Sequence, residues 1–144
     1  PSQIDYGAEL RILQAIRDHA AERIGLEGQS FPKVAVVGRP LSAGPCTDDL
    51  VVRTISLGRA HKTIPLTAAL CLAAAARIPG TLPWSLMPNG SHVYDGETTL
   101  SIAHPEGSIA VSVDARASEQ DGIAVTRVTG VRTARRIMEG FVYI

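Results

Sequence analysis

The stretch HKTIPLTAALCLAAAARIPGT, residues 61–81, sets a histidine and a lysine directly before a run that is almost wholly apolar and stops at Pro-Gly. Alanine and leucine dominate this run, so it predicts a helix over residues 67–77. No polar stripe separates one face of this helix from another, which favours a helix enclosed on every side. Cys71 lies inside it and is expected to be a small buried hydrophobe.

The segments around this helix predict short strands. Residues that favour strands occur in seven segments: 33–37, 49–58, 98–103, 107–113, 123–128, 133–139 and 141–144. In the second segment, alternation places Leu50, Val52 and Thr54 on one face and Val51, Arg53 and Ile55 on the other. Turns between the later strands, among them HPEG (104–107), are typical of a meander, and residues 82–96 are expected to form a loop.

An amphipathic helix is predicted over residues 6–24. Its apolar positions follow the helical period: Leu10, Leu13, Ile16, Ala20 and Ile24. Gly25 fits the left-handed position that commonly ends a helix. Together these patterns predict one α+β domain, residues 1–144. We expect a curled, mostly antiparallel sheet wrapped around one buried central helix, plus the amphipathic N-terminal helix.

Composition and spacing exclude several functions. The chain is 45% hydrophobic and 19% charged with a net charge of zero, so neither nucleic acid nor a membrane is an expected partner. The two cysteines and the four histidines (His19, His61, His92 and His104) lack the spacing of a metal site. A cytoplasmic protein is the simpler expectation. Four arginines near the end are expected on polar strand faces: Arg127, Arg132, Arg135 and Arg136.

The start of the central helix is the candidate binding site. Helix starts carry unpartnered N–H groups and a partial positive charge, which together favour an anion. His61, Lys62 and Thr63 precede this start. Thr67 is expected to cap the helix, and Arg53 to clamp a carboxylate. The residues alone leave open the alternative that His61, Lys62 and Arg53 are merely solvated.

Several stretches carry a family resemblance. They are FPKVAVVGRP (31–40), an arginine-bearing strand, HKTIPLTAALCLAAAARIPGT (61–81), HPEG (104–107) and GVRTARRIMEGFVYI (130–144). In this order they resemble the C-terminal half of the methylaconitate isomerase and oxalomesaconate tautomerase family. The likeness covers nearly the whole chain and is weakest over residues 82–98. It implies the diaminopimelate-epimerase fold, with two similar domains that each curl a sheet around one helix.

The resemblance also implies a reaction. Family members move a proton and a carbon–carbon double bond within a small unsaturated di- or tricarboxylate held between the domains, without a metal or organic cofactor. Their acid/base pair, a lysine and a cysteine, belongs to TSK-like and CGN-like motifs in the other half of the protein. Neither motif occurs in this sequence. We therefore expect no catalytic residue here. The start at Pro1 and the apolar end FVYI favour a piece of a longer protein, and the resemblance implies that the N-terminal half is the part that is missing.

Other hypotheses stay open. The chain could be a carboxylate-binding or interaction module of the same fold that has lost catalysis. It could also be a racemase or epimerase that uses Cys46. Epimerases of this fold place a thiol just before the central helix, and residues 61–67 contain none, which disfavours this last hypothesis. Assembly into a homo-oligomer is left open.

Overall fold

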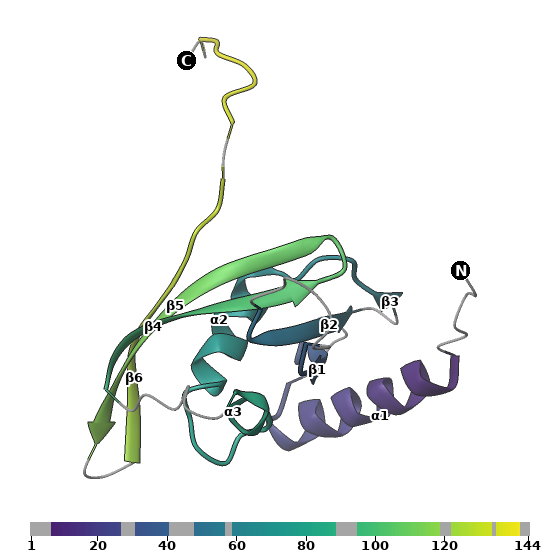
Figure 1. Ribbon diagram of the computed structural model, residues 1–144. Coiled ribbons are helices and arrows are strands. Elements are labelled where there is room, and N and C mark those ends of the chain that lie inside the picture. Colours follow the sequence, from purple (N-terminus) through teal and green to yellow (C-terminus); the bar gives the residue numbers. More distant parts are fainter. Residues whose placement is uncertain are drawn as a thin grey trace.

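A computed structural model describes residues 7–26, 31–40, 48–56, 59–88, 95–118, 122–133 and 135–141 of the chain. These residues form one six-stranded sheet and three helices (Figure 1). The helices are α1 (Gly7–Arg23), α2 (Leu66–Ala75) and α3 (Leu82–Leu86). The strands are β1 (Val34–Gly38), β2 (Leu50–Ser56), β3 (Arg59–Ala60), β4 (Gly96–His104), β5 (Gly107–Ser118) and β6 (Gly122–Gly130).

The sheet is mostly antiparallel, as predicted. Its order is β1-β2-β4-β5-β6, and β3 pairs with β2 alone. The long strands β4, β5 and β6 form the expected meander. The single parallel pair is β2 with β4, and it is short: Leu50 lies opposite Ile102 and Val51 opposite Ala103. Beyond these two positions the strands separate, and this opening shapes the candidate site.

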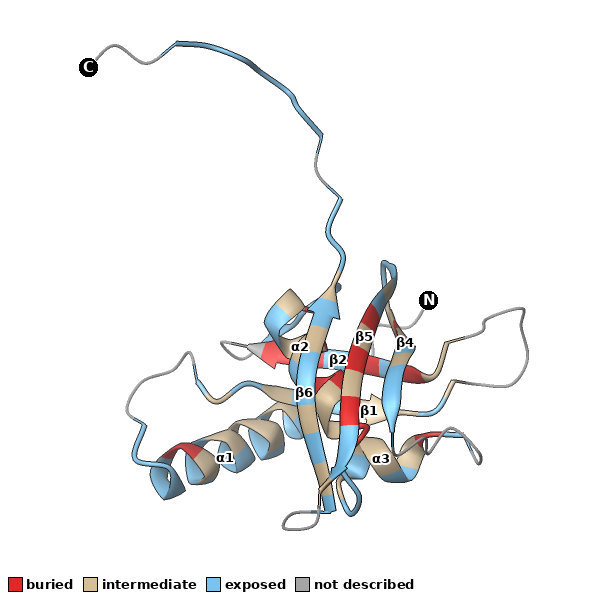
Figure 2. Cartoon of the chain, turned by 90° about the vertical axis from the view of Figure 1, so that its left-hand side faces the viewer, coloured by how far each residue is buried: buried red, intermediate tan, exposed pale blue. Residues whose placement is uncertain are grey.

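The core lies between α2 and the inner face of the curled sheet. Ala69, Leu72 and Ala73 of α2 are buried, and the largest fully buried side chains come from three strands: Leu50, Leu100, Ile102, Val111 and Val113. Alternation on β2 is as expected up to Thr54, because Leu50, Val52 and Thr54 are buried whereas Val51 and Arg53 are exposed. Ile55, expected on the face of Val51 and Arg53, is buried instead, at the position where β1 and β3 both pair with β2. Figure 2 shows the buried residues as bands along β5 and β2.

The expectation that α2 is enclosed on every side is wrong. Thr67 and Cys71 on this helix are exposed, although the predicted class of a curled sheet around a central helix is confirmed. The helix packs mainly against β5 and β6, so one of its faces remains open. An enclosing sheet would need more strands than the described residues supply.

The missing strands are those predicted after Gly130. Residues 131–133 and 135–141 form no strand, and each of them is exposed. They run away from the body of the protein as an extended tail (Figures 1 and 2). A strand needs an edge to pair with, and composition alone cannot supply one. The rest of the predicted segment 141–144 lies outside the described residues.

Three smaller corrections concern helices and a short strand. Residues 82–86, expected in a loop, form α3, whose start is capped by the hydroxyl of Thr81 accepting from the N–H of Trp84. The two-residue strand β3 was not predicted. α1 and the left-handed Gly25 are confirmed, but Ile16 and Ile24, expected on its packed face, are more than half exposed. α1 contacts mainly β1, a narrow surface that cannot cover a full helical face.

Candidate functional site

The segment before α2 is fastened to β2 by two hydrogen bonds. The N–H of His61 donates to the carbonyl of Thr54 at 2.9 Å, and the hydroxyl of Thr54 donates to the carbonyl of Thr63 at 3.2 Å. Thr54 is buried, at 3% exposure. These bonds hold residues 61–65 in the opening between β2 and β4, so that α2 begins there.

The start of α2 has no side-chain cap. Pro65 occupies the cap position with an extended backbone, and no side-chain hydrogen bond forms there. Thr67, expected to be the cap, lies inside the first turn and is exposed, so that expectation is wrong. The side chain of proline has no atom that can accept a hydrogen bond from the first N–H groups of the helix. These N–H groups therefore remain available to a ligand or to water.

A cavity of about 580 Å³ lies beside this helix start. We call it the helix-start cavity. It is formed by the segment before α2 and the first residue of this helix, by the end of β4 and the start of β5, and by the first residues after β6. Its lining residues are Thr63, Ile64, Pro65, Leu66, His104, Ser108, Ile109, Ala110, Val131, Arg132 and Thr133. Arg132 supplies a cationic group, and His104, Thr63, Ser108 and Thr133 supply polar ones.

Close packing at Gly130 brings the last of these residues over α2. A Cβ atom at this position would lie 2.6 Å from Cδ1 of Leu66 and 3.3 Å from Cδ2 of Leu70. Only glycine therefore lets the end of β6 pass so close to the first turns of α2 without a shift of these leucines. The residue two places on is Arg132, which lines the cavity.

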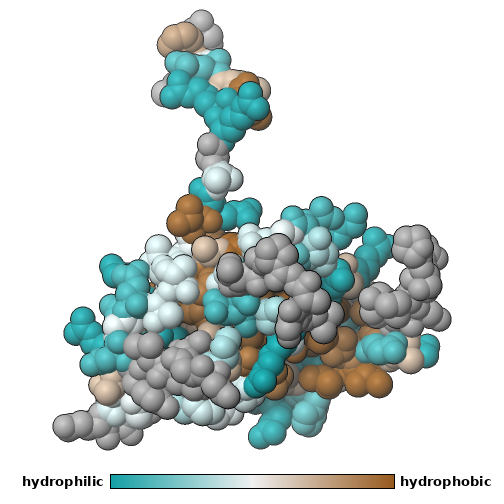
Figure 3. Space-filling view, viewed as in Figure 1, coloured by the Kyte–Doolittle hydropathy of each residue, from teal (hydrophilic) through white to brown (hydrophobic). Residues whose placement is uncertain are grey.

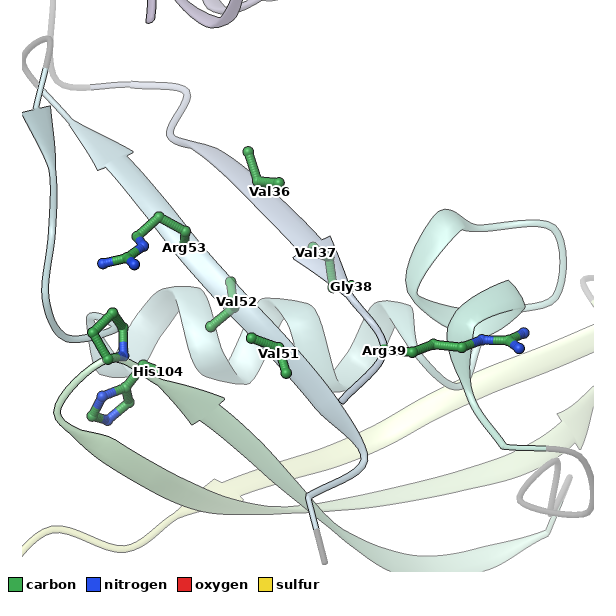
Figure 4. Close-up of a pocket in the computed structure, with 9 residues that line it drawn as sticks. Val36, Val37, Gly38, Arg39, Val51, Val52, Arg53 and His104 are labelled. Carbon is green, nitrogen blue, oxygen red and sulfur yellow. The ribbon is translucent and has the colours of Figure 1, made fainter. Parts of the chain in front are cut away.

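A second cavity, of about 380 Å³, opens on the outer face of β1 and β2. We call it the outer cavity. Its lining residues are Val36, Val37, Gly38, Arg39, Val51, Val52, Arg53, His104 and Pro105. Figure 4 shows Arg53 extending toward the side on which His104 lies, whereas Arg39 extends to the opposite end. There Nη2 of Arg39 donates to the carbonyl of Ser85 at 3.0 Å.

The five residues predicted to bind a carboxylate do not gather around either cavity. Thr63 lines the helix-start cavity, and Arg53 lines the outer cavity. His61, Lys62 and Thr67 are exposed and line neither. Nζ of Lys62 instead lies 3.6 Å from Oε1 of Glu106 in the turn between β4 and β5. Their part in binding stays a prediction.

His104 and Arg132 line the helix-start cavity although neither was predicted to bind a carboxylate. The HPEG segment was expected to be a turn, which is confirmed, yet His104 also lines both cavities. Arg132 was assigned to a strand face, but it lies in the tail and lines the helix-start cavity. Its signal was present, because Arg132 belongs to the closing stretch that carried the family resemblance.

Several other polar residues make structural contacts, and two lie outside the described residues. Oδ2 of Asp49 accepts from the N–H of Ser101 at 2.8 Å, and Oδ1 of Asp48 accepts from its hydroxyl. Arg127 forms an exposed ion pair with Glu97. Cys46 and His92 lie outside the described residues.

The described residues contain neither a metal site nor a membrane-spanning helix. No three His, Cys, Asp or Glu side chains among them are placed to hold a metal ion. Within the same ranges, no helix combines the length and the apolar character needed to cross a membrane.

The chain is similar in sequence to proteins named as isomerases. The chain is 34% identical to the 3-methylitaconate isomerase of Eubacterium barkeri, over all of this chain and 40% of that protein. It is 33% identical to the 2-methyl-aconitate isomerase of Shewanella oneidensis, over 95% of this chain and 37% of the relative. The chain thus spans about two fifths of the length of these relatives.

A solved structure agrees with the fold. The crystal structure of a methylitaconate-delta-isomerase superposes with a TM-score of 0.63 at 25% identity, covering 88% of this chain and 36% of that one. The model of the family described as PrpF protein matches residues 3–144. The resemblance inferred from the motifs is confirmed, and the chain belongs to the PrpF family.

Proposed function

We propose that this chain is the substrate-binding part of a cofactor-independent isomerase. The enzyme would move a proton and a C=C bond within a small unsaturated di- or tricarboxylate. The observation that carries the proposal is the helix-start cavity, in which an uncapped helix start, Arg132 and His104 converge. Relatives named for 3-methylitaconate, 2-methyl-aconitate and (4E)-oxalomesaconate support the class of substrate.

The cavity has the chemistry to bind a carboxylate. The first N–H groups of α2 carry the positive end of the helix dipole, and the guanidinium of Arg132 can form two parallel hydrogen bonds with one carboxylate. Ile64, Leu66 and Val131 give the same cavity an apolar wall against the carbon skeleton. Thr63 would add a hydroxyl, while Arg53 would act from the outer cavity on the other side of His104.

The proton transfer itself requires groups that this chain does not bring together. A double-bond shift needs a base that removes one proton and an acid that returns one at another carbon, each within hydrogen-bond reach. The described cavity offers His104 and Arg132 on one side of a bound acid, and arginine does not give up its proton. We therefore assign the acid/base pair to the remaining part of the enzyme.

We propose that the tail after Gly130 contacts that remaining part of the enzyme. The remaining part would precede this chain as an N-terminal domain. Val131, Ile137, Met138 and Phe141 are 74–94% exposed, and Figure 3 shows hydrophobic patches on an otherwise largely hydrophilic tail. Segments that favour strands and lack an edge in their own sheet commonly add to another sheet. The length of the relatives leaves room for such a domain.

The test is exchange with deuterated water. The purified 144-residue chain is incubated with trans-aconitate in D₂O, alone and then with an N-terminal part from a relative. We expect the acid to bind in both cases, and deuterium to enter it only when the second part is present. Exchange by the chain alone would show that the acid/base pair lies here. Binding without exchange in either case would favour a non-catalytic module.

A further inference from the structure

His104 is shared by the two cavities described above. It is the last residue of β4, is half-buried, and lines both the helix-start cavity and the outer cavity. His104 is thus shared by a cavity that Arg132 lines and a cavity that Arg53 lines. A group in this position can contact a ligand in either cavity.

The turn that follows determines which ring nitrogen carries the proton. The backbone N–H of Glu106 donates to Nδ1 of His104 at 3.3 Å. Because Nδ1 accepts, it carries no proton, and the proton of the neutral imidazole is on Nε2. Gly107 allows the backbone to adopt this tight turn, because its φ of 141° lies in a region that favours glycine.

The same turn is tied to the segment before α2. Nζ of Lys62 lies 3.6 Å from Oε1 of Glu106, the residue whose N–H holds the ring of His104. This ion pair links the turn between β4 and β5 to the helix start, across the opening between β2 and β4. Both side chains are largely exposed, so the link is weak and sensitive to salt.

We propose that His104 is the hydrogen-bond donor that orients the carboxylate substrate through its Nε2–H. Glu106 and Lys62 are positioning residues that keep the ring in this tautomer and at this distance from α2. A neutral N–H donor stabilises negative charge on the bound acid without transferring a proton. The role rests on the carboxylate site proposed above and adds to it a residue that fixes the orientation of the substrate.

A set of substitutions separates the N–H group from the shape of the side chain. His104→Gln places an amide nitrogen near the position of Nε2, His104→Asn places one near Nδ1, and His104→Phe keeps a ring without a donor. Binding of trans-aconitate to each folded variant is measured by calorimetry. We expect about tenfold weaker binding for His104→Phe and His104→Asn, and a loss of threefold or less for His104→Gln.

The tautomer is read independently of binding. Long-range ¹⁵N–¹H NMR of the wild-type chain, assigned with His104→Gln, should show the proton on Nε2 and a shift of this signal when trans-aconitate is added. A proton on Nδ1 would overturn the inference. Lys62→Met should weaken binding two- to threefold at low salt, with recovery in Lys62→Arg and no difference from wild type at about 1 M salt.

The outcomes distinguish the two proposals. If the wild type binds trans-aconitate, and Arg132→Ala weakens binding while all His104 variants bind like wild type, the role of His104 is wrong and the carboxylate site stands. If the wild type does not bind the acid, the proposed site is wrong and the role of His104 falls with it. If His104→Phe fails to fold, the comparison of glutamine with asparagine decides.

Discussion

The hydroxyl of Thr54 donates to the backbone carbonyl of Thr63, 3.2 Å away, and so joins the buried face of β2 to the segment that starts α2. The carbonyl of Thr54 accepts from the N–H of His61 in the same place. One buried residue thereby holds both ends of residues 61–63 in the opening where β2 leaves β4. The position of the helix start, and with it the helix-start cavity, depends on this attachment.

The first prediction concerns that attachment. Thr54→Val keeps the shape of the side chain but removes the hydroxyl, so we expect the free energy of unfolding to fall by about 1 kcal/mol. Affinity for trans-aconitate should fall severalfold, because the segment is released. Chemical denaturation and calorimetry measure the two effects. Thr54→Ser, which keeps the hydroxyl, is the control, and equal affinity in the valine variant would contradict the role of the bond.

The second prediction concerns Arg77, a buried cation beyond the end of α2. It is 5% exposed; its Nη1 donates to the hydroxyl of Thr98, whereas Nε and Nη2 have no hydrogen-bond partner. Burial lowers the pKa of Arg77, and the charge of Asp114 raises it in part. A buried charge without full pairing contributes little stability, so Arg77→Met should be neutral or stabilising by up to about 2 kcal/mol.

Denaturant unfolding tests the Arg77 prediction. Arg77→Ala is the matched control, because it removes the same charge but leaves a void, and should cost about 2 kcal/mol or more. A loss of similar size in Arg77→Met would show that the guanidinium itself stabilises the fold.

The third prediction follows from the open face of α2. Cys71 is exposed, contrary to the expectation from the apolar sequence around it. In a Cys46→Ser background, the native chain should therefore react with one equivalent of a disulfide reagent within minutes, without denaturant. The double variant with Cys71→Ser is the control. Reaction only after unfolding would mean that this face of α2 is covered in solution.

The fourth prediction concerns the tail. Truncation after residue 133 keeps Arg132 and the helix-start cavity but removes Ile137, Met138 and Phe141. These side chains are 83–94% exposed, so the melting temperature should change by no more than about 2 °C. Association with the N-terminal part of the enzyme should be lost. A markedly lower melting temperature would show that the tail packs on this body.

Much of the local structure followed from the sequence because its causes are local. Alternation along residues 49–58 correctly separated Leu50, Val52 and Thr54, which are buried, from Arg53, which is exposed, but it failed for Ile55, which is buried. The alanine-rich run gave a helix within one or two residues of its true ends, and HPEG formed the expected turn. The ordered motifs identified the family, which the match over residues 3–144 confirms.

Tertiary structure decided which of these elements meet. An apolar run shows that a helix avoids water, but only the closure of the sheet determines whether Cys71 is covered, and the sheet leaves it open. A strand-favouring tail becomes a strand only beside an edge, and residues 131–133 and 135–141 reach none among the described residues. His104 and Arg132 lie far apart in sequence and line one cavity because β2 separates from β4 and because Gly130 lets β6 pass close over α2. Such contacts depend on how strands diverge and pack, which periodicity along a single chain does not encode.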